Sequence, residues 1–511
     1  MSFYKEVFFA TLISGLLLLI ITFPARITPL NIYDDPLYLK ISNPELSYFK
    51  EFEDPEIYSS FSKFFSRYNL NDGRFIPLSI GVLWLIAKVT SANPLAIQAI
   101  LFSFSMLCGM LFFVLLRKLK IAFHLSVLFT CLFFSGHYDT MWYRRSGETF
   151  ALLFLFLSFL FFIKHFETRK ILFAFLSITS MICSVLFKES FIPLLPMVGL
   201  AMIIYTINER SDSFLQSFKT TMPFQLAWIC LLLLFIIIYL TNHSLHNYTE
   251  FSNSSQFLLH NLIVMCGSWY TVIPVITYAF YLLFLKQFKF IHLLFLALLT
   301  GWIGTQILVY YGIEIPTYSR YQMPALLLPL ILCALCTEEF RRRNFILLSH
   351  AFLTILTLII IINSKNIFQN AGFYKARAEA FHKMIGSIGN DIRTEHENLI
   401  VFTEHGEGFT SAVPLYLSKN NIEISKDNIR FIDFQISTKN KSFLNLCMDS
   451  SVYWIINSVP VENYSKVKQE YTCASRKEKV FTEKWFSASW REIATLPYEA
   501  WFSEISYVCY K

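Results

Sequence analysis

Two adjacent carboxylates lie shortly after the first long apolar segment of the chain, in the sequence Asn31-Ile-Tyr-Asp-Asp-Pro-Leu-Tyr38. A carboxylate pair at the edge of a membrane could supply a general base at the bilayer surface, and a cation or metal ion would relieve the repulsion between the two charges. The same Asp34-Asp35-Pro36 sequence could instead begin a short surface helix, with a carboxylate as its cap and the proline in its first turn. The residues alone leave both interpretations open.

Charged side chains also gather between the apolar runs 121–136 and 147–163, where the chain contains Asp139, Arg144, Arg145 and Glu148. Because a guanidinium group can form two parallel hydrogen bonds with a phosphate, the arginines are candidate phosphate ligands. Alternatively, they are interfacial residues whose charged ends reach water from a belt of aromatic side chains.

Two more candidate groups stand at the ends of apolar runs. Lys188 and Glu189 fill a corner that leaves no room for a loop. This pair either neutralises itself or offers its ammonium group to an anionic headgroup. Near the run 322–337 the chain contains Tyr318, Arg320 and Tyr321. The arginine could bind a lipid phosphate between the two rings, or it could anchor the helix at the interface.

Composition places these residues in a membrane protein. Hydrophobic residues make up 55% of the 511-residue chain, charged residues only 15%, and the mean hydropathy is +0.49. A soluble chain of this length needs far more polar surface. The formal charge of +7 requires no nucleic-acid partner, because residues 364–511 hold 18 Lys and Arg against 17 Asp and Glu, so the excess lies in the apolar part. The chain contains no Walker, HExxH, Gly-x-Ser-x-Gly or Gly-x-Gly-x-x-Gly motif.

Twelve apolar runs are candidate spans: 8–23, 75–90, 95–116, 121–136, 147–163, 171–187, 190–206, 224–240, about 262–285, 290–310, 322–337 and 345–363. Run 75–90 is the weakest, since it is short and contains Pro77 and Lys88. Leaving it out, with the N-terminus in the cytoplasm, puts the basic clusters at 117–120, 164–170, 210–219, 286–289 and 341–343 on the cytoplasmic side. The sequence therefore predicts about eleven spans, with 75–90 at the outer interface and the candidate residues on the outer side.

The expected architecture has two parts. Residues 1–363 form an all-α polytopic membrane domain, with a first outer loop at 24–94 that carries juxtamembrane helices. Residues 364–511 form a soluble extracytoplasmic domain. In that tail the spacing predicts a helix at 370–395, strands at 398–402, 429–433 and 452–456, and a helix near 408–419. Alternation of strands and helices indicates a small α/β domain.

Four motifs together resemble the GT-C superfamily of membrane glycosyltransferases, which includes protein O-mannosyltransferases and the aminoarabinose transferase of lipid A. The resemblance covers residues 1–363. Many members have Asp-Glu where this chain has Asp34-Asp35. The matching motifs are the acidic pair in Tyr33-Asp34-Asp35, the second-loop acid in Arg145-Ser-Gly-Glu148, the Lys-Glu of Lys188-Glu189, and the late-helix start Arg320-Tyr-x-x-Pro324.

The resemblance implies transfer of a sugar from a polyprenyl-phosphate donor to a glycolipid, polysaccharide or protein at the outer face of a bacterial inner membrane. Asp34 or Asp35 would be the catalytic base, and Arg74 would line the cavity. No cofactor would be required, although a divalent cation could assist. The expected ligands of the donor phosphate and lipid are Arg320, Tyr321, Lys188, Arg144, Arg145 and Tyr318. The alternatives are a lipid-linked oligosaccharide polymerase or ligase, and a flippase or other lipid or sugar transporter.

Overall fold

The computed structural model describes the chain in fifteen stretches, which cover most of its length. They are residues 2–30, 35–68, 76–136, 141, 144, 147–241, 254–285, 289–309, 322–395, 398–403, 406–422, 429–433, 453–457, 475–487 and 498–510. Within them the chain forms two compact units. Unit 1 comprises Met1–Ile21, Phe65–Val82 and Leu101–Ile367, and unit 2 comprises Thr22–Phe64, Leu83–Ile100 and Phe368–Lys511.

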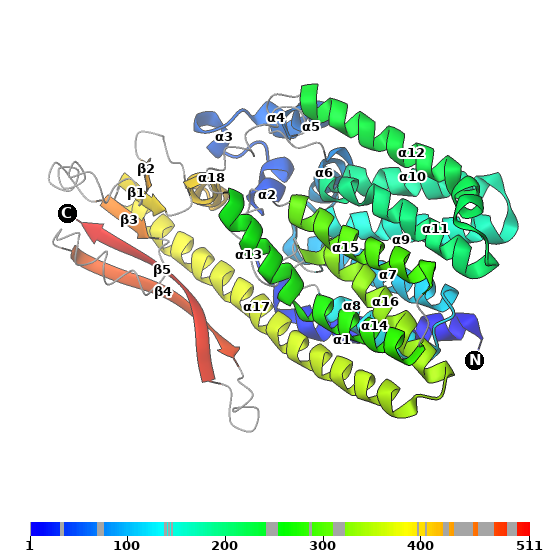
Figure 1. The fold of residues 1–511 in the computed structure, drawn as a ribbon. Coiled ribbons are helices and arrows are strands. Elements are labelled where there is room, and N and C mark those ends of the chain that lie inside the picture. Colours follow the sequence, from blue (N-terminus) through cyan, green and yellow to red (C-terminus); the bar gives the residue numbers. More distant parts are fainter. Residues whose placement is uncertain are drawn as a thin grey trace. The chain divides into compact units, whose positions relative to one another are not determined.

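Unit 1 is helical in its described residues, as Figure 1 shows. Five helices have residues in both units: α1 (Phe3–Arg26), α5 (Phe61–Ser66), α6 (Pro77–Thr90), α7 (Pro94–Lys118) and α17 (Ile346–Glu395). The other elements of unit 1 are α8 (Phe123–Ser135), α9 (Gly147–Thr168), α10 (Ile171–Phe187), the 3₁₀ helix η2 (Glu189–Leu194), α11 (Leu195–Arg210), α12 (Phe214–Thr241), α13 (Ser254–Gly267), α14 (Trp269–Leu285), α15 (Phe290–Val309) and α16 (Met323–Arg342).

The chain is an integral membrane protein. Among the described residues, eight helical segments are long and apolar enough to cross a bilayer, and the pair α13 and α14 is a ninth if it counts as one span. The predicted run 262–285 is broken there, with a bend of 56° between Leu258–Gly267 and Thr271–Phe284. With the shorter apolar helices α8 and α10, these segments number eleven, in the predicted order; α6 is the twelfth apolar segment.

Ion pairs gather several basic clusters at one end of unit 1. They join Lys118 to Glu167 (3.0 Å), Lys120 to Glu209 (2.8 Å), Arg117 to Glu6 (3.0 Å), and Arg341 and Arg342 to Glu338 (2.6 and 2.9 Å). Glu338 also accepts a hydrogen bond from the Ala122 backbone N–H (3.1 Å). Clusters that the sequence assigned to a common side of the membrane therefore share one end of the helical unit. The assignment of that end to the cytoplasm stays a prediction.

Phenylalanine fills the interior between α7, α8 and α9. The Phe112 ring lies 4.8 Å from Phe133 and 5.4 Å from Phe156, measured between centroids. All three side chains are fully buried. Lipid tails are as apolar as these rings, so inside a membrane their contribution comes from close packing rather than from removal of water.

Unit 2 contains short helices and a sheet. The helices are α2 (Pro36–Ser42), α3 (Tyr48–Glu51), α4 (Pro55–Ser59) and α18 (Gly406–Lys419), together with the C-terminal part of α17. α17 is continuous over 50 residues, which corresponds to about 75 Å. The predicted span 345–363 and the predicted helix 370–395 are thus one helix, and the expected boundary at 363/364 falls inside it. The polar residues after Ile362 suggested an end, yet none of them is a helix-breaking proline.

The sheet has five strands in the order β2-β1-β3-β5-β4. β1 (Asn398–Thr403), β2 (Ile429–Asp433) and β3 (Tyr453–Asn457) pair in parallel and coincide with the strands predicted from short apolar runs. β4 (Ser475–Ser487) and β5 (Tyr498–Tyr510) form a long antiparallel pair, drawn in orange and red in Figure 1. These two strands were not predicted, because their apolar residues do not alternate regularly.

Candidate functional site

The antiparallel helices α9 and α10 of unit 1 are joined by serine side chains. Ser184 Oγ donates to the Ala151 carbonyl (2.7 Å), and Ser177 Oγ donates to the Ser158 carbonyl (2.8 Å). Small residues at a helix interface allow close approach, and their hydroxyls form hydrogen bonds between helices where no water competes. The start of α9 is thereby held next to the end of α10.

Gly147 permits the closest approach between these two helices. A Cβ atom at this position would lie 2.8 Å from the Phe187 carbonyl oxygen and 3.1 Å from Ser79 Oγ. The first contact is with backbone, which cannot rotate away as a flexible side chain can. Glycine is therefore required where the first turn of α9 faces the last turn of α10.

This approach brings Glu148 and Lys188 together. Lys188 Nζ lies 3.2 Å from Glu148 Oε1, and their side chains are only 10% and 2% exposed. Lys188 thus forms an ion pair with a residue of another helix, and its role toward an anionic headgroup stays a prediction. Desolvating two charges is costly, so a buried pair in an apolar unit indicates a task beyond stability. Arg144, four residues before Glu148, is also buried, with 2% exposure.

The Glu148–Lys188 pair lies at the end of unit 1 opposite to the basic clusters. α9 begins at Gly147 and ends at Thr168, so its two ends are about 33 Å apart. Glu148 is in its first turn, whereas Glu167, the partner of Lys118, is in its last. Within this unit the basic clusters and the Glu148–Lys188 pair thus lie at opposite ends, as the sequence predicted.

Hydrogen bonds also hold the end of α15 and the start of α16 near this corner. Gln306, in the last turn of α15, donates from Nε2 to the carbonyl oxygen of Ser190 in η2 (3.5 Å). Trp302 Nε1 donates to the Pro324 carbonyl at the start of α16 (2.6 Å). The end of α15 and the start of α16 are thus held together beside η2, which begins directly after Lys188.

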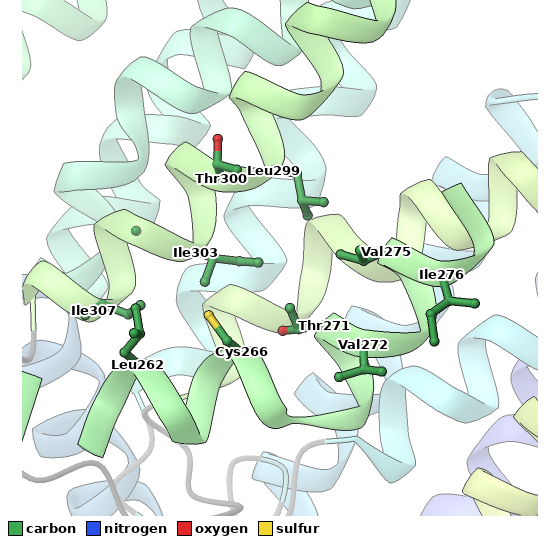
Figure 2. Close-up of a pocket in the computed structure, with 11 residues that line it drawn as sticks. Leu262, Cys266, Thr271, Val272, Val275, Ile276, Leu299, Thr300, Ile303 and Ile307 are labelled. Atoms are coloured by element: carbon green, nitrogen blue, oxygen red, sulfur yellow. The ribbon is translucent and has the colours of Figure 1, made fainter. Parts of the chain in front are cut away.

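An apolar pocket of about 490 Å³ lies between α13, α14 and α15, as Figure 2 shows. Its lining is almost entirely aliphatic, and it has one cysteine and two threonines: Leu262, Cys266, Thr271, Val272, Val275, Ile276, Leu299, Thr300, Ile303, Gly304 and Ile307. Such a lining suits a hydrocarbon chain rather than a polar ligand.

Asp35 belongs to unit 2 and is buried, with 1% exposure. It occupies the N-cap position of α2, followed by Pro36 in the first turn, but its side chain makes no cap hydrogen bond. Instead, the Tyr374 hydroxyl of α17 donates to Asp35 Oδ2 (3.3 Å). The expected short helix with Pro36 in its first turn is therefore present. The Asp35 carboxylate, however, accepts a hydrogen bond from a side chain 339 residues away.

α17 holds the chain before Asp35 as well. His382 Nε2 lies 2.8 Å from the Leu30 carbonyl oxygen. A carbonyl can only accept, so His382 carries its proton on Nε2 when this bond forms. α18 contributes a third tie, because Ser418 Oγ accepts from the Tyr48 backbone N–H (3.0 Å). Residues of α17 and α18 thus hold the segment 30–48 at several points.

A buried lysine anchors α2 from within the loop. Lys40 Nζ lies 2.6 Å from Glu53 Oε1, and the rings of Tyr48 and Tyr58 are 5.3 and 5.6 Å from its charge. Tyr58 also donates to Glu53 Oε2 (2.6 Å). Burial lowers the pKa of Lys40, and the Glu53 carboxylate acts in the opposite direction. The cluster holds α2 in place five residues after Asp35.

The structure describes only some of the predicted site residues. Lys188 and Glu148 are brought together in unit 1, Arg144 and Glu189 are in the same unit, and Asp35 is in unit 2. Outside the described residues lie Asp34, Arg74, Asp139, Arg145, Tyr318, Arg320 and Tyr321. In the part of the chain that is described, no three His, Cys, Asp or Glu side chains are grouped so that they could hold a metal ion.

Sequence reasoning missed four residues that contact a candidate or lie close to one in the chain or through a neighbour. They are Tyr374, His382, Ser190 and Gln306. The first two stand in a helix with no recognised motif. The last two are single uncharged residues, and serine or glutamine at the end of an apolar run does not by itself indicate a function. No pattern in the sequence distinguishes them.

No protein-family model matches this chain, and no curated protein resembles it significantly in sequence. Among solved structures, it is similar to two crystal structures of ArnT from Cupriavidus metallidurans, one bound to undecaprenyl phosphate and one in the apo state. Each has 9% sequence identity to this chain and a TM-score of 0.46, over 99% of this chain and 98% of the other.

Proposed function

We propose that this protein transfers a sugar from a polyprenyl-phosphate donor to an acceptor at the extracytoplasmic face of a bacterial inner membrane. The observation that carries the proposal is the buried Glu148–Lys188 pair, which occupies the end of an apolar helical unit opposite to its basic clusters. Ionisable groups buried at membrane depth are costly and mark functional sites. The motif resemblance to GT-C glycosyltransferases supplies the class of reaction.

In this reaction an acceptor hydroxyl oxygen bonds to the anomeric carbon of the sugar while the bond from that carbon to the phosphate oxygen breaks. The acceptor proton passes to a carboxylate, and polyprenyl phosphate leaves. Negative charge develops on the phosphate, so cations aimed at it lower the barrier. We assign this role to Lys188 and Arg144, whose positions the structure describes. The sequence motifs suggest Arg320 and Arg145 as further cations.

Asp34 and Asp35 are the candidate bases. Asp35 is buried and hydrogen-bonded by Tyr374, which suits a carboxylate whose orientation must be fixed. The adjacent Asp34 is the second candidate. A base must be aligned opposite the leaving group, which explains why the loop that carries this pair is tied at several points.

The donor's isoprenoid chain needs an apolar groove. The pocket between α13, α14 and α15 has such a lining, and α15 also reaches the Lys188 corner through Gln306. We propose that part of the isoprenoid occupies this pocket. The acceptor is a glycolipid, a polysaccharide or a protein.

A transporter is less well supported. Helices α10 and α15 contain no Asp, Glu, Lys or Arg, and the charged residues of α7 lie in its last turn. Transport pathways for charged substrates usually carry ionisable residues in mid-helix. A lipid-linked oligosaccharide polymerase or ligase would use the same leaving group, and the size of the transferred glycan separates it from a transferase of single sugars.

The proposal is tested by comparing cells that lack the protein with cells that produce the wild type, Asp34→Asn, Asp35→Asn or Lys188→Met. Mass spectrometry of extracted lipids measures the polyprenyl-phosphate sugars. We expect one such donor to accumulate in the deletion strain and in the Lys188→Met strain, and in at least one of the two Asp→Asn strains. A lipid profile unchanged by deletion would refute the proposed function, and activity in both Asp→Asn variants would remove the proposed base.

A further inference from the structure

Ser190 and Gln306 form a buried polar pair next to the Lys188 corner. Their exposures are 2% and 0%. The side chain of Gln306 donates to the backbone carbonyl of Ser190, so the two residues adjoin each other although they are 116 positions apart. Ser190 is two residues after Lys188, which places their Cα atoms within about 7 Å.

Two of their polar atoms have no partner in the part of the chain that the structure describes. These are Ser190 Oγ and Gln306 Oε1. Buried polar atoms in proteins are nearly always hydrogen-bonded, and an unpaired one in an apolar helical unit is costly. The half-buried Gln225 on α12 gives a contrast, because its Nε2 donates to the Gly199 carbonyl (3.0 Å) and to Thr221 Oγ1 (3.4 Å).

The chemistry of the two atoms selects a neutral hydroxyl group. An amide oxygen only accepts hydrogen bonds, so Gln306 Oε1 needs a donor and would repel an anion. A serine hydroxyl both donates and accepts. A sugar hydroxyl can donate to Gln306 Oε1 and accept from Ser190 Oγ, whereas an ionised phosphate oxygen can make only the second bond.

We propose that Ser190 and Gln306 form the subsite that binds a hydroxyl group of the donor's sugar. The inference rests on the proposed function and divides the site by charge. Lys188 serves the phosphate, and the neutral pair beside it serves the sugar directly attached to that phosphate. Selection among sugars then depends on hydrogen bonds whose loss is penalised because they are buried.

Binding to two kinds of lipid tests this division. The full-length protein in nanodiscs is titrated with undecaprenyl phosphate and with the same lipid carrying one glucose, mannose or galactose, and native mass spectrometry measures the affinities. We expect the wild type to bind at least one of the sugar-bearing lipids more tightly than the bare lipid. Ser190→Ala and Gln306→Leu should each weaken that binding about five- to tenfold, while the affinity for undecaprenyl phosphate is unchanged.

Matched variants separate this role from a structural one. Gln225→Leu removes an amide that is already paired and should leave the preference between the two lipids intact. Lys188→Met should weaken the binding of both kinds of lipid. Gln306→Leu should change the melting temperature little, because it removes a buried acceptor without a partner together with the long 3.5 Å hydrogen bond from Nε2 to the Ser190 carbonyl. A lowered melting temperature with intact sugar preference would show a structural role, for instance through a buried water, and would overturn the inference.

The proposed function and the subsite fail in different ways. If the wild type binds none of the four lipids, the proposed function is wrong and the subsite falls with it. The sugar subsite is refuted, while the lipid site stands, if the wild type binds all four lipids equally. The same conclusion follows if Gln306→Leu lowers the affinity for the bare lipid as strongly as that for the sugar-bearing lipid.

Discussion

The two regions that carry candidate residues are held together by different means. In unit 1, Glu148 and Lys188 stand at the open end of an antiparallel helix pair, close in sequence and fixed by hydrogen bonds between neighbouring helices. In unit 2, Asp35 lies in a loop of short helices, and its partner Tyr374 comes from α17. The charges that we propose to bind a phosphate thus lie on neighbouring helices, whereas the candidate base contacts a residue far away in the sequence.

The strongest test of the local scaffold removes one member of its ion pair. Glu148→Gln removes the carboxylate that lies 3.2 Å from the buried Lys188 ammonium, which should destabilise the fold by about 3–5 kcal/mol and abolish transfer. Thermal unfolding in detergent and lipid analysis measure the two effects. The double variant Glu148→Leu/Lys188→Met should recover most of the stability and none of the activity. Recovery of activity in the double variant would mean that the pair has only a structural role.

A second test separates the two helices without touching a charge. In Gly147→Ala the new Cβ meets the Phe187 carbonyl at 2.8 Å, so the start of α9 must move away from the end of α10. We expect a loss of about 1–3 kcal/mol in stability and at least a tenfold loss of transfer. Gly267→Ala is the control, since a Cβ there meets no atom within 4 Å. Equal activity of both alanine variants would contradict the need for this approach.

The difference between the regions also explains what the sequence could predict. Apolar runs define the spans of unit 1, and basic clusters correctly grouped the ends that the ion pairs join. Lys188-Glu189 stood out because charge is rare there. Nothing in the sequence indicates that Lys188 pairs with Glu148, since that depends on the serine and glycine contacts between α9 and α10.

In unit 2 the long-range contacts were beyond prediction. The Tyr374–Asp35 bond joins a helix without a motif to a loop 339 residues earlier. Periodicity does not indicate which tyrosine of 26 reaches a given carboxylate. The same limit applies to α17, which continues through the polar residues near 363 where the sequence predicted the end of a span.

The dependence of the base on the tail is tested by Tyr374→Phe, which removes one hydroxyl. A hydrogen bond to a charged acceptor contributes about 1.5–3 kcal/mol when buried, and the 3.3 Å distance puts this one at the lower end. We expect kcat to fall about tenfold with little change in KM, because the bond orients the base and does not bind the donor. Tyr4→Phe, at a position 85% exposed, should change neither constant. An effect confined to KM would place Tyr374 in substrate binding instead.

The smallest effect concerns a single serine between α9 and α10. Ser184→Ala removes the bond to the Ala151 carbonyl, and interhelical hydrogen bonds of this kind in membrane proteins contribute about 0.6 kcal/mol. We expect a slight decrease in melting temperature and nearly full transfer, because Gly147 and the Ser177–Ser158 contact still hold the helices together. Combining Ser184→Ala with Ser177→Ala should reduce transfer more than the sum of the single changes. Simple additivity would show that the corner is positioned by the packing at Gly147 alone, and that the serines contribute only to stability.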